Sequence, residues 1–480
     1  MINVRRVDIH GVPFIGFRGT FSSKKGLPRL EEDLIAVNLM KSKGVYAKVF
    51  TDDGRVARVR LNDFKHMSLL PSLHPDSFTQ SFVSGSILKK AERLLENYPI
   101  ILARAQKMQE APINWGGLPF DFNFCDAMVV ATADYPNGKW EFGERGALYP
   151  FEQMNIHPSA VVLHYGQGIF EGMKVFYSKQ GRLVAFRPQD NAARMQRGAE
   201  RLCMNPIPTD FLIEAVKATV IGNKRLLPPY GVGASMYVRP FEFGSGPKLG
   251  VKPAAEDTLC IFASPVGPYF KGGLTPITLL VESNSRRSAH GIVGNIKAGG
   301  NYAPSMLVAK EAKKQHPEVS EVIYLSSDGQ NKIEEVGAAN FFAIEEESDG
   351  RIALITPRLT GTILPGITRD SVIKLAKAFG YSVMEKDIAI ETVMRGETIV
   401  GAFCTGTAAV ISPIGKIIME NGSEAKEVSF NGGTVHPVAE KLYHALTALQ
   451  VEDWDNEALK DLPKEFIDEV KKEWVYVLEE

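Results

Sequence analysis

Cysteine is scarce in this chain of 480 residues, which contains only four of them. Cys125, Cys203, Cys260 and Cys404 lie far apart, and no CxxC pair occurs. Structural zinc sites need closely spaced thiolates, so we expect no metal site. So few cysteines are typical of a reducing compartment, because disulfides persist mainly in oxidising ones.

Net charge and long apolar runs are also missing. The formal net charge is −1, from 55 basic and 56 acidic residues, so we expect neither a nucleic-acid nor a membrane partner. No apolar run approaches the roughly 20 residues that cross a bilayer, and the first ten residues lack the apolar core of a signal peptide. The chain is poor in acidic residues up to Arg29. We expect a cytoplasmic protein, with an organellar matrix as the alternative.

The length suggests two or three domains. Residues 1–110 are expected to form a small α+β unit of unknown role. Val45–Leu61 alternates apolar and polar residues around an Asp-Gly turn, which predicts a hairpin. Pro28–Lys41 places leucines on one helical face, and a second helix is expected before Pro99.

Beyond residue 110 the pattern changes, because short β-rich runs alternate with helical patterns. The segment Pro265–Gly273 is rich in proline and glycine and is a candidate linker. We therefore expect a mixed α/β fold with one lobe at 111–267, a second lobe at 268–456, and an acidic C-terminal tail at 457–480.

The segment GNIKAGGNYAPS, from Gly294 to Ser305, carries the strongest chemical signal. A reactive lysine must spend part of its cycle as a neutral amine, so its site has to disfavour the ammonium form. The two glycines after Lys297 let a bulky cofactor approach the backbone. By itself this short motif also fits a surface lysine in a glycine loop.

The motif closely resembles the lysine motif of the branched-chain aminotransferases, which are fold-type-IV enzymes that use pyridoxal 5′-phosphate (PLP). The resemblance covers about residues 112–456 and continues in the family's order through LHYGQGIFEG, AFRPQDNAARMQRGAERL, YVRPFEF, IEEVGAANFF, LPGITRDSV and CTGTAAVISP. It implies two α/β lobes with PLP between them. The family is usually a homodimer, with residues of the partner near the substrate pocket.

The resemblance also assigns roles around the cofactor. It implies that Lys297 forms the Schiff base with PLP and moves the substrate proton, and that Tyr302 contacts the phenolic oxygen. Glu335 is expected to pair with the pyridine nitrogen, which keeps the ring protonated, whereas Glu334 is expected to be a solvated neighbour. The phosphate contacts implied by the resemblance are Arg194, Ile367, Thr368, Gly406 and Thr407.

Two physical features agree with those phosphate contacts. Arg194 lies on a helix that we expect to begin at Asp190 or Asn191, and its planar fork suits bidentate phosphate binding. The other contacts are expected at helix N-termini, whose free N–H groups bind anions.

Substrate recognition is implied for a further set of residues. Arg239 is expected to bind the second carboxylate of glutamate or 2-oxoglutarate, and Phe170 to line an apolar pocket. Aromatic residues on strands often belong to the core, which is the alternative for this set. The full set implied by the resemblance is Tyr165, Phe170, Tyr237, Arg239, Thr407 and Ala408.

The expected activity is reversible transamination of leucine, isoleucine and valine with 2-oxoglutarate. The alternatives are a D-amino acid aminotransferase, an aminodeoxychorismate lyase, or a non-catalytic PLP-binding regulatory protein. The chain departs from many relatives at Ala409 and Ser412, which stand where those relatives carry a CxxC pair. It also continues well beyond Trp454, where the family typically ends.

Overall fold

The computed structural model describes residues 3–9, 12–18, 34–37, 49–50, 56–57, 113–142, 147–267, 274–422 and 424–479. The chain divides into two compact units, one formed by residues 1–113 and 144–146, the other by residues 114–143 and 147–480. In the first unit, β1 (Asn3–Ile9), β2 (Val12–Arg18) and β3 (Leu34–Val37) form an antiparallel sheet. A short antiparallel pair joins β4 (Val49–Phe50) and β5 (Val56–Ala57).

These strands test two predictions for the N-terminal region. The hairpin expected over Val45–Leu61 is confirmed by the pairing of β4 with β5. The helix expected over Pro28–Lys41 is wrong at Leu34–Val37, because these four consecutive apolar residues, two of them β-branched, pair with β2 as a strand. The helix expected before Pro99 lies outside the described residues.

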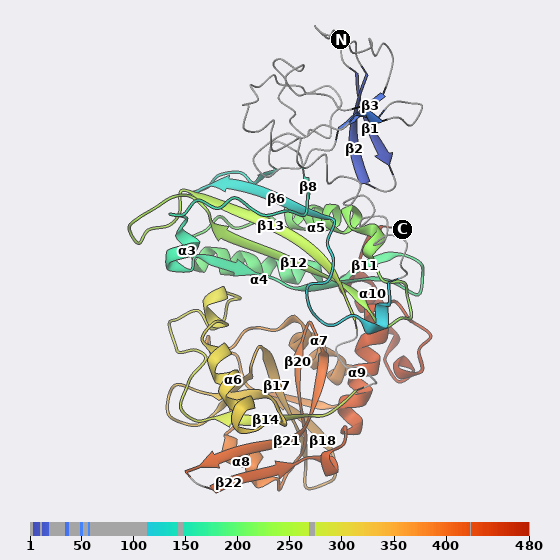
Figure 1. Cartoon of the computed structure of the whole chain (residues 1–480). Helices are drawn as coiled ribbons and strands as arrows, with labels where there is room; N and C mark the ends of the chain where they lie inside the picture. Colours follow the sequence, from blue (N-terminus) through green and yellow to red (C-terminus); the bar gives the residue numbers. More distant parts are fainter. Residues whose placement is uncertain are drawn as a thin grey trace. The chain divides into compact units, whose positions relative to one another are not determined.

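The second unit contains two nine-stranded sheets, each with its own helices (Figure 1). The strands of the first sheet run in the order β23-β11-β10-β12-β13-β6-β7, with β8 on β6 and β9 on β12. Each pair of neighbouring strands in this sheet is antiparallel. The strands are β6 (Ala127–Asp134), β7 (Glu141–Phe142), β8 (Leu148–Pro150), β9 (Gly168–Phe170), β10 (Met173–Tyr177), β11 (Leu183–Phe186), β12 (Ser235–Gly244), β13 (Glu256–Val266) and β23 (Val475–Glu479).

The second sheet is mixed and partly closed. Its strand order is β16-β15-β14-β21-β20-β17-β18-β19, with β22 on β21, and an additional pairing of β16 with β17 closes six strands into a ring. Strands in such a ring have one face inside it and one outside, so both faces can be buried. The strands are β14 (Ile277–Glu282), β15 (Val319–Leu325), β16 (Ile333–Val336), β17 (Ala339–Glu346), β18 (Ile352–Thr356), β19 (Ser382–Glu385), β20 (Ile399–Gly406), β21 (Val410–Asn421) and β22 (Glu424–Ser429).

Helices accompany both sheets. Three helices lie before strand β14 in the chain, namely α3 (Val161–Tyr165), α4 (Pro188–Arg201) and α5 (Thr209–Gly222). Five helices lie after it, namely α6 (Ser305–Gln315), α7 (Ile367–Ala378), α8 (Ile390–Arg395), α9 (Pro437–Gln450) and α10 (Lys464–Glu473). Short 3-10 turns lie at η2 (Trp115–Gly117), η3 (Lys224–Leu226), η4 (Gly299–Asn301), η5 (Asn431–Gly433) and η6 (Glu457–Leu459). Within the described ranges, no helix combines the length and apolarity needed to cross a bilayer.

Helix α4 begins earlier than the sequence indicated. We expected its start at Asp190 or Asn191, but the first helical residue is Pro188, a position where proline costs no hydrogen bond. The preceding Arg187 adopts a left-handed conformation with φ 51° and ends strand β11 abruptly. Helix α7 covers most of the TRDSVIKLAKAFG segment, for which a helix was predicted, and ends at Ala378.

The segment expected to be an acidic tail, residues 457–480, is not a separate tail, because its described residues fold as η6, α10 and β23 and bury several apolar side chains. Strand β23 pairs with β11 at the edge of the first sheet, and Trp474 is only 1% exposed. The Trp474 ring meets Phe186 and Phe466 edge to face, with centroids 5.9 and 5.5 Å away. The acidic composition suggested a tail, but the helix is amphipathic: the charged residues of α10 face water, whereas Val470 is buried.

We expect Trp474→Ala to lower the free energy of unfolding by about 3–5 kcal/mol, because it removes a large buried ring. The control is Lys472→Ala on exposed helix surface, expected to change stability by less than about 0.5 kcal/mol. Urea unfolding of the two purified variants measures both values. Equal stability of the two would contradict the packing described for the C-terminal segment.

Candidate active site

Lys297 lies where the backbones of the two lobes meet. The N–H of Phe170 donates to the carbonyl of Lys297 at 3.0 Å, and Ala298 forms an isolated antiparallel bridge with Ile169. The turn after the lysine is held by Asn301, whose amide donates to the carbonyls of Val293 and Ile296 at 2.7 and 2.9 Å. The asparagine of the sequence motif therefore fixes the loop that carries the lysine.

The amine of Lys297 sits in a buried aromatic setting. Its Nζ lies 3.1 Å from the hydroxyl of Tyr302 and 4.7 Å from the ring centroid of Phe170. Burial lowers the pKa of Lys297 to about 8, helped by the positive charges of Arg194 and Arg239. Carboxylates nearby oppose that shift only in part. The site thus meets the requirement for a lysine that is readily neutral.

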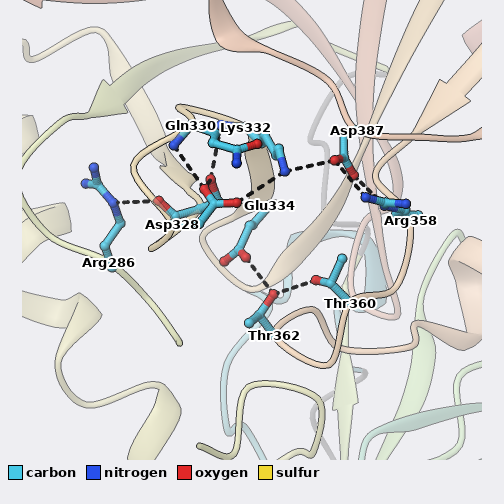
Figure 2. A network of polar contacts seen from close by, with 10 residues as sticks. Arg286, Asp328, Gln330, Lys332, Glu334, Arg358, Thr360, Thr362 and Asp387 are labelled. Atoms are coloured by element: carbon cyan, nitrogen blue, oxygen red, sulfur yellow. Dashed lines mark hydrogen bonds and ion pairs between the residues drawn. The ribbon is translucent and has the colours of Figure 1, made fainter. Parts of the chain in front are cut away.

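Glu335 and Glu334 are neighbours on β16 that have different surroundings. Glu335 is 3% exposed, pairs with Arg287, and accepts a hydrogen bond from Asn340 at 3.2 Å. Burial raises its pKa to about 7, although Arg287 opposes the shift. The expectation that Glu334 is solvated is wrong, because it is 5% exposed and accepts from Thr362 at 2.5 Å (Figure 2).

Arg194 is buried on α4 and forms a bidentate ion pair with Glu171. Its Nε donates to Oε1 at 2.7 Å, and its second terminal nitrogen donates to Oε2 at 2.8 Å. The other terminal nitrogen donates to the carbonyl of Pro365 at 3.1 Å, just before α7. Although burial opposes the shift, Arg194 holds the pKa of Glu171 below its usual value. Arg194 therefore connects both lobes.

The start of α7 offers free backbone donors. Ile367 and Thr368 are its first two residues, and the N-cap Gly366 provides no side-chain cap. The N–H groups of a first helical turn have no partner within the helix. A Cβ on Gly366 would lie 2.0 Å from the amide oxygen of Asn340, the residue that donates to Glu335, so only glycine fits at this position.

The Gly406–Thr407 segment is not a helix N-terminus, which corrects the sequence-based expectation. Gly406 ends β20, and the residues up to Val410 form the turn into β21. The hydroxyl of Thr407 donates to the carbonyl of Gly172 at 3.3 Å, directly beside Glu171. The carbonyl of Ala408 accepts from Lys174 at 2.6 Å, and burial lowers the pKa of that lysine to about 8.

The residues expected to recognise the substrate are only partly gathered. The guanidinium carbon of Arg239 lies 4.9 Å from the ring centroid of Phe170 and 5.3 Å from that of Tyr237. Phe170 in turn meets Tyr302 with centroids 4.9 Å apart. Tyr165 stands apart, since it is 43% exposed and its hydroxyl donates to the carbonyl of Leu249 at 2.5 Å.

Sequence reasoning missed the groups that hold the predicted residues in place. Glu171 is fully buried, although it lies within a segment already singled out, and Arg287 is nearly as buried. A charged residue within the apolar run around Phe170 was the available signal for Glu171. No such signal marks Arg287, because the stretch around it is polar.

Comparisons with known proteins agree with this geometry. The model of the family described as amino-transferase class IV matches residues 168–417. The chain is 40% identical to the branched-chain-amino-acid aminotransferase of Haemophilus influenzae, over 71% of this chain and 96% of that protein. The chain belongs to the branched-chain amino acid aminotransferase family.

Other members of that family extend the likeness to plants and to solved structures. The chain is 42% identical to branched-chain amino acid aminotransferase 2, chloroplastic, of Humulus lupulus, over 72% of this chain and 80% of that protein. The crystal structure of the Escherichia coli branched-chain amino acid aminotransferase is 26% identical and aligns with a TM-score of 0.57. The alignment covers 74% of this chain and 100% of that structure. The mixed α/β fold expected of a fold-type-IV aminotransferase is thereby confirmed.

We expect Arg239→Gln to raise the pKa of the Lys297 amine above about 8 in cofactor-free protein, because a positive charge that lowers it is removed. The pH dependence of trinitrobenzenesulfonate labelling at Lys297, followed by mass spectrometry, measures the shift. Arg197→Gln is the matched control, since Arg197 is exposed on α4. An unchanged pKa in Arg239→Gln would show that this arginine does not act on the amine.

Proposed function

We propose that this protein catalyses reversible transamination between leucine, isoleucine or valine and 2-oxoglutarate, with PLP as cofactor and Lys297 as the Schiff-base lysine. The observation that carries the proposal is the buried amine of Lys297, which has a pKa of about 8 and lies 3.1 Å from the Tyr302 hydroxyl. A structural lysine would need a permanent charge partner in such a setting.

The chemistry of the surrounding groups fits PLP. Arg194 has five N–H donors, and three of them are used by Glu171 and Pro365, which leaves donors for a phosphate. Together with Thr407 and the first turn of α7, it supplies positive charge and N–H groups. Glu335 supplies a buried carboxylate for the protonated pyridine nitrogen, with Tyr302 at the phenolic oxygen.

When bound, PLP supplies an aldehyde for the amino group and an electron-poor ring that accepts the electron pair released at the substrate's Cα. The chain's own groups do the rest. Lys297 takes the proton from Cα and returns it to the cofactor side as its amine alternates between neutral and charged forms. Arg287 favours the ionised form of Glu335, because its positive charge lowers the pKa that burial raises.

Substrate selection is proposed to rest on the aromatic wall and on one arginine. Phe170 and Tyr237 surround Arg239, which would bind the second carboxylate of 2-oxoglutarate, while the ring of Phe170 receives an apolar side chain. The backbone of Thr407 and Ala408 would border the same space. The YVRPFEF and LHYGQGIFEG segments favour this substrate class over D-amino acids and aminodeoxychorismate.

A homodimer is part of the proposal. Tyr165 was expected at the substrate site, yet its side chain is exposed and contacts Leu249. Leu163 on the same helix is 56% exposed, so α3 presents apolar surface that a second copy would cover. Tyr165 of one protomer would then serve the pocket of its partner.

We place the reaction in the cytoplasm or in an organellar matrix.

A substrate panel on PLP-loaded protein tests the activity. We expect turnover with L-leucine, L-isoleucine and L-valine in the presence of 2-oxoglutarate, and none with D-alanine or aminodeoxychorismate. Lys297→Ala should abolish turnover while PLP still binds through its phosphate. Turnover with D-alanine alone would assign another class IV activity, and near-normal turnover of Lys297→Ala would refute the role of that lysine.

Arg194→Ala should mainly weaken PLP retention, because a charge-assisted contact to phosphate is lost and Glu171 is left unpaired. We expect the dissociation constant for PLP to rise by about tenfold or more. Equilibrium dialysis against PLP measures this, with Arg197→Ala on the exposed face of α4 as control. A lower substrate affinity with unchanged PLP affinity would place Arg194 in the substrate site.

The N-terminal unit is proposed to be dispensable for the chemistry, since every residue given a role lies beyond position 160. A chain that begins at Ala111 should keep the visible PLP absorbance and most of its turnover with L-leucine. Loss of turnover in a shortened protein that folds and binds PLP would show that residues 1–110 contribute to the active site or to dimer assembly.

A further inference from the structure

A cavity of about 370 Å³ lies beside β16, and its lining includes Glu334 but not Glu335. Successive side chains of a strand point to opposite faces, so the side chain of Glu334 points away from the face of β16 that carries Glu335. The walls of the cavity come from the turn after β15, the loop between β18 and α7, and Asp387 after β19. None of the residues assigned to the reaction lines it.

One part of the wall is apolar. Ile333, Pro357 and Ile363 are buried, and Leu359 is 45% exposed. The volume exceeds what a single water or metal ion fills, because one water takes about 30 Å³ of liquid. A cavity of this size with an apolar side fits a small organic molecule.

The polar part of the wall is short of hydrogen-bond donors. Glu334 is 5% exposed, and its Oε2 has no hydrogen-bond partner within the described part of the chain. Thr362 donates its only hydroxyl proton to Oε1 of Glu334, so Thr360, 2.9 Å from Thr362, must donate to Thr362. Glu334 Oε2 and the Thr360 oxygen therefore both remain acceptors.

The cations that line the cavity are already paired with other carboxylates. Lys332 lies 3.2 Å from Asp328 and 2.9 Å from Asp387, and Arg358 donates to Asp387 at 2.6 and 3.0 Å. Figure 2 shows the carboxylate of Glu334 pointing toward Thr362 and away from these ion pairs. Lys332 and Arg358 thus pair with Asp328 and Asp387, and Glu334 forms an ion pair with neither of these two cations.

We propose that this cavity is a second small-molecule site, which takes a primary ammonium group on a short apolar chain. The ammonium would donate to Glu334 and Thr360, and the chain would pack on Ile333, Leu359 and Ile363. Such a partner satisfies a buried carboxylate that otherwise stays costly to bury. Apolar α-amino acids and the corresponding amines share this chemistry.

The cavity opening distinguishes these two sources. The Arg358 side chain is 59% exposed and can receive a carboxylate on its outer side, and the exposed His290 also lines the cavity. An α-amino acid would therefore bind more tightly than its amine. The site is also linked to the reaction centre, because Arg287, the partner of Glu335, donates to the carbonyl of Thr362 at 2.6 Å.

The test uses full-length protein loaded with pyridoxamine 5′-phosphate, whose amine does not react with amino groups. Excess 4-methylpentanoate fills the substrate pocket, and it lacks the ammonium that the second site requires. Equilibrium dialysis then measures binding of radiolabelled L-leucine and of 3-methylbutylamine. We expect one saturable site per chain for each ligand, with L-leucine bound more tightly.

Two variants and one control assign that binding to the cavity. Glu334→Gln removes the charge and Leu359→Trp fills the apolar side, and each should weaken binding by about tenfold or more. Glu321→Gln, a half-buried glutamate on β15 outside the cavity, should leave it unchanged. Absence of saturable binding to the wild-type protein, or binding that both cavity variants retain, would overturn the proposal.

Discussion

The buried ion pair between Glu171 and Arg194 is the interaction on which the site depends. It joins α4 to the segment between β9 and β10, and the remaining contact of Arg194 reaches Pro365 before α7. Buried pairs add little net stability, yet removal of one partner strands a charge at a cost of about 3–5 kcal/mol. The pair therefore holds α4 of the first lobe close to the start of α7 in the second lobe. The groups proposed to bind the phosphate are held in position with them.

The same burial sets the acid–base properties of the site. It lowers the pKa of Lys297 to about 8 and raises that of Glu335 to about 7, so both groups come close to neutral pH from opposite directions. The surrounding charges adjust these values. The charges of Arg194 and Arg239 lower the pKa of the lysine further, whereas Glu171 and Glu335 raise it and favour the protonated form.

The sequence motifs predicted those features of the site that depend on residues close together in the chain. Lys297 and Tyr302 are five residues apart and meet because the intervening turn is encoded in the same segment, and α7 follows its amphipathic pattern. Glu171 and Arg287 matter through partners more than twenty residues away, which no local pattern reveals. The solvated role given to Glu334 failed for a related reason: closure of the strand ring buries both faces of β16, and a single sequence does not display that closure.

Strand β23 completes the first sheet by pairing with β11, about 290 residues earlier in the chain. Contacts of such long range form late in folding, because the entropy cost of closing a large loop comes before the contacts contribute any stabilisation. During synthesis the edge of β11 therefore stays open while the whole second lobe is made. A nascent chain would expose that edge and the ring of Phe186 to other proteins until Trp474 emerges, so the chain is prone to aggregation during its synthesis.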